Sequence, residues 1–537
     1  MQTIKPILSD KRTSIAIVAL AIVARIVQLI FFYNIRVDGM YQVMAMQNFV
    51  DGHGISTAKV LPGDLSTIIY EPLINWPPGY SIILAPFYIL FGHNYMLAGM
   101  AVDILGAVLL IFACRKILRV LDTPIYLVNI FTLLTGFFIY YFYFINSSDA
   151  IAISFFVLGI YYAIKLLKKG SFSISLTLLI VACLFLSGLI KYLFIPVVYI
   201  VPLFILLKGW ADRNKGLERS GFLSFLLLIV SLGAVLLWQK INTGSSTYIS
   251  EPGRGFFPGN LANAHPAIPS SFINPDTFQL LFDEGSNAYM MIFRALQGIH
   301  ILLFLAALIY ILRRIIKKGL KDLFLTDSFF YLGFFLSVGI TAVLVILSLT
   351  VAKEENIPGH LWTYVEEPRY YGLINVLIHL GIFVLYQYYR LNKTKKLKYL
   401  LVVLVLLLLP ETFRGILFTA KRVIKVKTEK YSWQQEWEIQ DYAELMIKKY
   451  KLPGEMAVVT CSSYYVNYRI GIYNHIPILL EYPPPGEPIK VSSKKPALLL
   501  LVDQQDPTKE EVPIEERLGY AGSWEGFDFY IIHVKPD

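Results

Sequence analysis

The sequence has few charged residues for its length. Only 16% of its 537 residues are Asp, Glu, Lys or Arg, whereas 56% are hydrophobic. Soluble domains average about a quarter charged residues, and a water-soluble core cannot absorb this excess of apolar side chains. The shortage of charge therefore excludes an ordinary soluble protein and indicates a chain that lies largely in a bilayer.

Cysteine is also scarce. Cys114 and Cys183 fall in apolar runs and Cys461 lies in the C-terminal tail, so we expect neither a disulfide framework nor a cysteine zinc site. We also expect no cleavable signal peptide, because the first apolar run, Ser14 to Phe32, is long enough to span a membrane and lacks a small-residue cleavage motif after it.

The basic residues lie in short clusters between apolar runs. The net charge of +10 could suggest nucleic acid, but this spacing is typical of cytoplasmic loops. A span needs roughly 17–25 mainly apolar residues. The predicted spans are Ser14–Ile35, Tyr95–Leu118, Thr123–Ile145, Ala150–Leu167, Phe172–Leu189, Ile190–Leu207, Gly221–Ile241, Met290–Ile315, Ser328–Thr350, Tyr370–Tyr389 and Tyr399–Phe418.

With about eleven spans, every basic cluster falls on the side of the N-terminus. The N-terminus is then cytoplasmic and the tail lies outside. Merging the fifth and sixth spans near Lys191 would put later clusters outside, and counting Pro78–Phe91 as a span would break the parity. We interpret Pro78–Phe91 as an interfacial helix, because it is short and begins at a proline pair.

Two domains are predicted. Residues 1–419 form the membrane domain, with long outer loops at 34–94 and 242–289 and a shorter, charged one at 351–369, and residues 420–537 form a small α/β domain outside the membrane. The tail elements expected are a helix at Glu429–Lys451, a strand at Met456–Thr460, a helix at Ser462–Arg469 and strands at Ala497–Val502 and Phe529–Val534. Function is expected where the outer loops converge.

Two carboxylates fall at predicted outer ends of spans. Asp38 opens the first outer loop, and Asp149 lies in a very short turn between the third and fourth spans. Either carboxylate can act as a general base, and together they can hold a divalent cation, Mg or Mn. The plainer alternatives are a solvated Asp38 paired with Arg36 and a helix N-cap at Asp149.

Several other side chains are candidates for substrate binding. Trp76 and Tyr80 can stack on a sugar ring or sit at the bilayer interface, and His53 and Glu71 lie in the same loop. Cations near span ends can clamp a phosphate, although Lys191 can instead snorkel to the membrane surface and Arg369 can form an Arg–Glu pair on its loop. These candidates are Lys191, and Arg369 with its neighbours Glu367 and Tyr370. Inside the spans, Arg25 and Asp103 are expected to form a buried ion pair.

These motifs resemble the GT-C fold in their order and topological side. They are the acidic start of the first outer loop, Trp76-Pro77-Pro78-Gly79-Tyr80, the turn ending in Asp149, and Glu367-Pro368-Arg369-Tyr370. The chain resembles the bacterial aminoarabinose and galacturonic acid transferases of lipid A, and the protein O-mannosyltransferases. In this resemblance Asp38 is the base or metal contact and Asp149 the second acid, whereas Lys191 and Arg369 contact polyprenyl phosphate. Many members have two adjacent acids in the first loop, but here Gly39 follows Asp38.

The resemblance implies an inverting transfer of a sugar from a polyprenyl-phosphate donor. The acceptor is a lipid, glycan or protein on the outer face of a bacterial cytoplasmic membrane. Alternatives are a surface-polysaccharide polymerase or ligase, a lipid or solute transporter, and a scaffold acting through its tail. A transporter usually places polar groups along its spans, whereas here they gather in outer loops.

Overall fold

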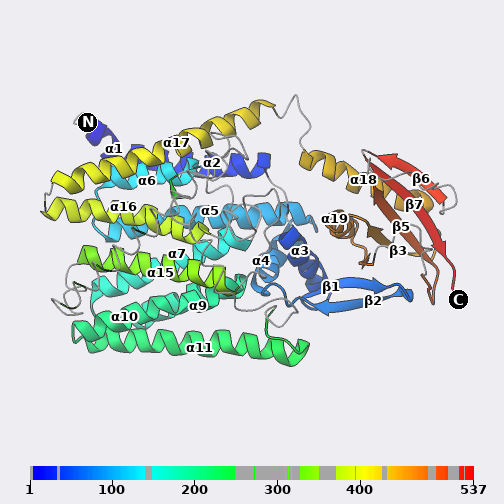
Figure 1. The fold of residues 1–537 in the computed structure, drawn as a ribbon, viewed down its shortest axis with the longest axis horizontal. Helices are drawn as coiled ribbons and strands as arrows, with labels where there is room; N and C mark the ends of the chain where they lie inside the picture. Colours follow the sequence, from blue (N-terminus) through cyan, green and yellow to red (C-terminus); the bar gives the residue numbers. More distant parts are fainter. Residues whose placement is uncertain are drawn as a thin grey trace. The chain divides into compact units, whose positions relative to one another are not determined.

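A computed structural model gives the fold of the chain (Figure 1). It describes residues 4–32, 35, 37–138, 148–247, 271–272, 302, 309, 313, 316, 327–349, 371–392, 395–425, 432–481, 491–505, 519–524 and 526–536. Contacts divide the chain into two compact units. Unit 1 comprises Met1–Tyr33, Ile74–Gly79 and Met100–Val423, and unit 2 comprises Asn34–Leu73, Tyr80–Gly99 and Ile424–Asp537.

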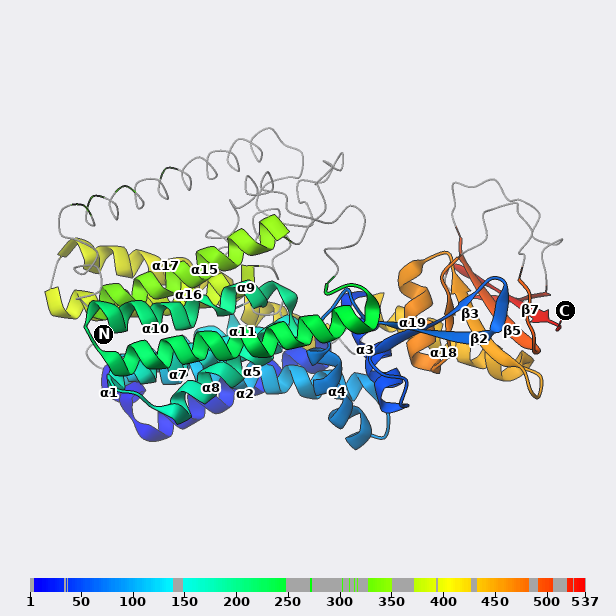
Figure 2. The same cartoon turned by 90° about the horizontal axis from the view of Figure 1, so that it is seen from below.

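Unit 1 is built of helices that run side by side (Figure 2). Because a bilayer offers no hydrogen bonds to the backbone, apolar runs of this length satisfy their peptide groups internally as helices. The helices are α1 (Ile4–Ser9), α2 (Lys11–Phe32), α5 (Tyr95–Val120), which begins in unit 2, α6 (Ile125–Phe137), α7 (Ser148–Lys169), α8 (Ile174–Ile190), the 3-10 turn η2 (Tyr192–Phe194), α9 (Ile195–Val198), α10 (Ile200–Ala211), α11 (Lys215–Thr243), α15 (Asp327–Leu349), α16 (Gly372–Asn392) and α17 (Lys395–Lys425).

The described residues of the predicted spans are largely helical, although the third is described only as far as Phe138 and the sixth is divided among η2, α9 and α10. Within these residues, six helical stretches are long and apolar enough to cross a membrane: Lys11–Ile30, Tyr95–Val120, Ser148–Lys169, Tyr192–Ala211, Lys215–Thr243 and Leu401–Lys421. Of the predicted span Met290–Ile315, the structure describes just residues 302, 309 and 313, so the total of about eleven spans stays a prediction.

Glycines bring the helices of unit 1 into close contact. A Cβ atom on Gly136 of α6 would lie 2.8 Å from the Cα atom of Ala21 on α2, and one on Gly221 of α11 would lie 2.6 Å from the backbone nitrogen of Leu206 on α10. Small residues at helix crossings are typical of membrane bundles, where helices associate by close van der Waals contact. Larger residues at these two positions would force the helices apart.

Arg25 is buried inside unit 1, with 4% of its surface exposed. Its Nε donates to the carbonyl oxygen of Thr135 at 2.8 Å, and its Nη1 donates to the side-chain oxygen of Gln28 at 3.0 Å. Asp103 is 1% exposed. The structure thus confirms that both charges are buried, whereas the ion pair between them stays a prediction.

Unit 2 contains a seven-stranded sheet with the order β2-β1-β4-β3-β5-β7-β6 (Figure 1). Pairing is parallel from β1 through β4 and β3 to β5, and antiparallel for β1–β2, β5–β7 and β6–β7. The strands are β1 (Ser56–Leu61), β2 (Asp64–Pro72), β3 (Met456–Cys461), β4 (Ile478–Leu479), β5 (Ala497–Gln504), β6 (Gly519–Trp524) and β7 (Phe527–Val534).

The hairpin β1–β2 comes from the first predicted outer loop, whereas the other strands come from the tail. Lys59 and Val60 of β1 pair in parallel with Ile478 and Leu479 of β4. One apolar core joins the two parts, because Leu65 of the hairpin packs with residues of the tail that include Val458 and Leu499. The predicted division at residue 419 does not include this hairpin in the tail domain.

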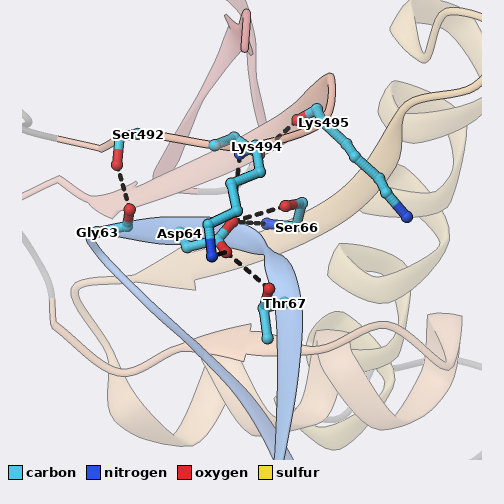
Figure 3. Close-up of polar contacts among 8 residues, drawn as sticks. Gly63, Asp64, Ser66, Thr67, Ser492, Lys494 and Lys495 are labelled. Atoms are coloured by element: carbon cyan, nitrogen blue, oxygen red, sulfur yellow. Dashed lines mark hydrogen bonds and ion pairs between the residues drawn. The ribbon is translucent and has the colours of Figure 1, made fainter. Parts of the chain in front are cut away.

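Asp64 fastens the tip of the hairpin to the tail (Figure 3). Its carboxylate accepts hydrogen bonds from the side chains of Ser66 and Thr67, at 2.6 Å each, and lies 3.4 Å from the Nζ atom of Lys494. The hydrogen bonds from Ser66 and Thr67 hold the pKa of Asp64 well below its usual range. Beside it, the backbone nitrogen of Leu65 donates to the carbonyl oxygen of Ser492 at 3.0 Å.

Four helices accompany this sheet: α3 (Val37–Val50), α4 (Gly79–Leu90), α18 (Ser432–Tyr450) and α19 (Tyr464–Asn474). Both tail helices and the strands β3, β5 and β7 were predicted, and the structure confirms them. The predicted segment Pro78–Phe91 is the helix α4, and its place at the bilayer interface stays a prediction. The structure thus confirms a helical chain with a small C-terminal α/β sheet region.

Leu65→Ala is expected to loosen the tail even though the residue lies in the first loop. Its side chain is fully buried, and truncating a buried leucine typically costs about 2–5 kcal/mol. Hydrogen exchange of the full chain should show faster exchange in β3 and β5, by roughly thirtyfold or more. Leu61→Ala is the matched control, because Leu61 of the same hairpin is 47% exposed. Unchanged exchange in Leu65→Ala would contradict the shared core.

Candidate functional site

Asp149 lies in the first turn of α7, where a carboxylate is favoured by the helix dipole. The residue is only 3% exposed. A buried carboxylate needs compensation, because its desolvation costs more than a helix terminus returns. Because α7 begins at Ser148, Asp149 is the second residue of the helix rather than its N-cap, and its burial demands a further partner.

Lys191 supplies that partner from the end of α8. Its Nζ atom forms a short ion pair with the Oδ1 atom of Asp149, and the two side chains are 14% and 4% exposed. The pair joins α7 to α8 inside unit 1. The sequence predicted each residue as a site candidate, and the structure brings the two together.

The backbone stops being helical at Lys191. This residue is extended, with φ −144° and ψ 118°, between α8 and η2. Pro196 explains the break, because a proline cannot donate to the carbonyl of Tyr192 four residues earlier. Beneath the break, the hydroxyl of Ser187 donates to the carbonyl oxygen of Ala152 at 2.9 Å and fixes α8 against α7. Lys191 therefore lies at a defined break between the helices α8 and η2.

Gly79 packs directly on the end of α8, next to this break. A Cβ atom on Gly79 would lie 2.5 Å from the carbonyl oxygen of Leu189, so glycine is required for the approach. Trp76 is partly exposed, and the side-chain oxygen of Asn75 is buried. Gly79 of the Trp-Pro-Pro-Gly motif thus lies against the helix end that is followed by Lys191, within unit 1.

Asp38 belongs to unit 2, in the first turn of α3, where it is partly exposed. Tyr41, one turn further on, shares its helix face. The Tyr41 ring lies 4.3 Å from the ring of Tyr468 and 6.0 Å from that of Tyr464, measured between centroids. Burial raises the pKa of Tyr468 above its usual range.

The helix α19 of the tail holds α3 in place. The side-chain amide of Gln47 donates to the carbonyl oxygen of Ile472 at 3.0 Å, and the hydroxyl of Tyr465 donates to the carbonyl oxygen of Ile35 at 3.3 Å. The helix that carries Asp38 is therefore fixed by residues of the tail. Sequence reasoning did not find this tyrosine cluster, although the repeated tyrosines of Tyr464-Tyr465 and Tyr468 were a signal available in the sequence.

The remaining candidates of the first loop are spread over unit 2 and its boundary. His53 is exposed and stacks on Tyr70, with ring centroids 3.9 Å apart, and Glu71 pairs with Lys59 across the hairpin. Tyr80 is 3% exposed, so protein covers the ring that was expected to stack on a sugar. Trp76 is the aromatic residue of that motif whose side chain is partly exposed.

The candidates Glu367, Arg369 and Tyr370 lie outside the described residues. A divalent cation fits Asp149 poorly, because the Oδ1 atom is already paired with the ammonium of Lys191, whose positive charge repels a second cation. In the described part of the chain, no group of three or more His, Cys, Asp or Glu residues is arranged to hold a metal ion. We therefore derive no chemistry through a metal.

Lys191→Met is expected to destabilise unit 1 by about 3–5 kcal/mol, because it leaves the carboxylate of Asp149 buried without its cation. Thermal unfolding of the purified protein in detergent measures the loss. The double variant Asp149→Asn with Lys191→Met should recover part of it, since both charges are gone. Lys215→Met, which removes the 88% exposed member of the Lys215–Glu218 pair, should leave the melting temperature almost unchanged. Equal melting temperatures for Lys191→Met and wild type would contradict the buried pair.

Comparison with known proteins gives matches in structure alone. No protein-family model matches the sequence, and no curated protein matches it. The crystal structure of ArnT from Cupriavidus metallidurans bound to undecaprenyl phosphate aligns with a TM-score of 0.51 and 12% identity, over 96% of this chain and 97% of that chain. The archaeal oligosaccharyltransferase AglB from Archaeoglobus fulgidus, in complex with an inhibitory peptide and a dolichol-phosphate, aligns with a TM-score of 0.45 and 10% identity, over 92% of this chain and 70% of that chain.

The assignment of the fold rests on the alignment with ArnT, because this alignment covers nearly the full length of both chains at a TM-score above one half. At 12% identity it shows the fold alone. The long apolar helices of unit 1 agree with it. The chain therefore has the GT-C-like fold of a multi-pass membrane protein, as its motifs predicted.

Proposed function

We propose that the chain is an inverting glycosyltransferase that moves a sugar from a polyprenyl-phosphate donor to an acceptor hydroxyl. The observation that carries the proposal is the buried Asp149–Lys191 pair, placed at a helix break within a GT-C-like fold. The structure of ArnT, which shares this fold, was determined with undecaprenyl phosphate bound. A lipid-linked donor also suits a membrane chain whose candidate residues gather at helix ends.

In this proposal Lys191 contacts the phosphate that leaves, and Asp149 is the positioning residue that holds the ammonium at the break. A negative charge develops on the leaving phosphate, and a fixed cation stabilises it without reorganisation. Arg369 is proposed to hold the same phosphate through its forked guanidinium. Trp76 is the proposed stacking surface for the sugar, and Glu367 and Tyr370 are proposed as further substrate contacts.

Asp38 is proposed as the general base. The acceptor oxygen attacks the anomeric carbon from the face opposite the phosphate, the bond from that carbon to the phosphate oxygen breaks, and polyprenyl phosphate leaves. The proton of the acceptor hydroxyl passes to the Asp38 carboxylate. The acceptor is a lipid, glycan or protein, and the neighbouring tyrosines around Tyr41 offer rings against which a glycan can pack.

Asp38→Asn is expected to lower sugar transfer by about 10²–10⁴-fold, because an amide cannot accept the proton. Membranes that carry each variant are supplied with a labelled polyprenyl-phosphate sugar, and label in the acceptor fraction is counted. Asp51→Asn is the matched control, since Asp51 follows the other end of α3 and pairs there with His475 at 2.8 Å. Equal transfer by wild type and Asp38→Asn, at equal expression, would remove Asp38 from the mechanism.

The proposal places unit 2 outside a bacterial cytoplasmic membrane and the N-terminus inside. A cysteine in place of Lys494, which is 83% exposed, should react with an impermeant maleimide in intact cells. A cysteine in place of Lys215, which is 88% exposed, should react only after the membrane is opened. Background labelling is expected to be low, because the three native cysteines are buried. The reverse pattern would overturn the orientation.

A further inference from the structure

A cavity of ≈ 760 Å³ lies in unit 1 along the faces of α2 and α5. One wall is apolar and includes Ile15, Val18 and Ile22. Their spacing of three and four residues places them on one stripe of α2. Phe112 of α5 adds to this wall, and Ile15 and Phe112 are 61% and 43% exposed. The cavity therefore offers an open apolar surface to the bilayer.

The other wall of the cavity is basic. It contains Lys11, Arg115, Lys116 and Arg119. Lys116 and Arg119 follow Phe112 by one and two turns of α5, so the basic and apolar walls continue one another along the same helix. Among the described residues, no carboxylate forms an ion pair with any of these four cations.

The nearest acids in the sequence are engaged elsewhere. The Oδ2 atom of Asp10 accepts the backbone N–H groups of Arg12 and Thr13, at 2.8 and 3.0 Å. The carboxylate of Asp122 lies 3.7 Å from the Nζ atom of Lys168. The cavity therefore keeps a net positive charge at its basic wall.

Arg115 is a buried part of this wall, and hydrogen bonds fix its side chain. The residue is 9% exposed. Its Nη1 donates to the side-chain oxygen of Asn129 at 2.9 Å and to the hydroxyl of Thr132, and its Nη2 donates to the hydroxyl of Ser14 at 2.9 Å. All three acceptors are neutral, so they orient the guanidinium without cancelling its charge.

We propose that this cavity binds an anionic phospholipid. The phosphate headgroup lies against Lys11, Lys116 and Arg119, with the fixed charge of Arg115 behind them, and an acyl chain follows the apolar stripe from Ile15 to Ile22. Basic pockets between membrane helices recognise lipid phosphates in this way. A free phosphate would use the basic wall alone and leave the apolar wall uncovered, so the two walls together favour a lipid. The site is independent of the proposed sugar transfer.

Native mass spectrometry of the full chain, released from detergent and titrated with cardiolipin, measures this binding. Wild type should retain cardiolipin in preference to phosphatidylcholine, and an excess of inorganic phosphate should not displace it. The double variant Lys116→Gln with Arg119→Gln should bind cardiolipin about thirtyfold more weakly. Each cation near an anionic headgroup raises the binding affinity by about fivefold. Both residues are exposed, so the variant is expected to fold.

The matched control is Lys165→Gln with Lys169→Gln, which removes two exposed charges from the C-terminal half of α7, away from the cavity lining. It should bind cardiolipin as wild type does. Three results would each overturn the proposal. Wild type could show no preference for cardiolipin, both double variants could lose the same affinity, or inorganic phosphate could displace the lipid, which would indicate a bare anion site.

Discussion

A charge that folding removes from water must find an opposite charge or strong hydrogen bonds. The Asp149–Lys191 pair is one point in unit 1 where this constraint acts, because the two side chains are only 4% and 14% exposed and come from different segments. Lys191 pairs with Asp149 where the chain leaves helical geometry at the end of α8, and Gly79 packs on that same end. The break and the pair thus lie beside the glycine of the Trp-Pro-Pro-Gly motif.

In unit 2 the corresponding constraint is that strand edges must be paired or covered. The edge of β4 is paired by β1, a strand that precedes it by about four hundred residues in the sequence. This pairing joins the first loop to the tail, and α3 then packs on α19. The tail therefore positions the helix that carries Asp38, which gives this small domain a role in the proposed chemistry without requiring a catalytic residue of its own.

Unit 1 holds cations in two contrasting ways. Lys191 is neutralised by an acid and sits in a rigid frame, which suits a residue that must keep a fixed position. The cations of the cavity along α2 and α5 have neutral partners or none among the described residues, so their charge remains available to a ligand. Both sets of cations are proposed to meet a phosphate, and they differ in whether an acid or neutral groups hold them in place.

The sequence by itself determined the helices, because an apolar run of some twenty residues needs no distant partner to become helical in a bilayer. It likewise determined β3, β5 and both tail helices from local patterns, and it singled out Asp38, Asp149 and Lys191. Only the tertiary structure decided that Lys191 pairs with Asp149, that protein covers Tyr80, and that β1 and β2 extend the sheet of the tail. These outcomes depend on contacts between segments far apart in the chain, and no local pattern of residues encodes them.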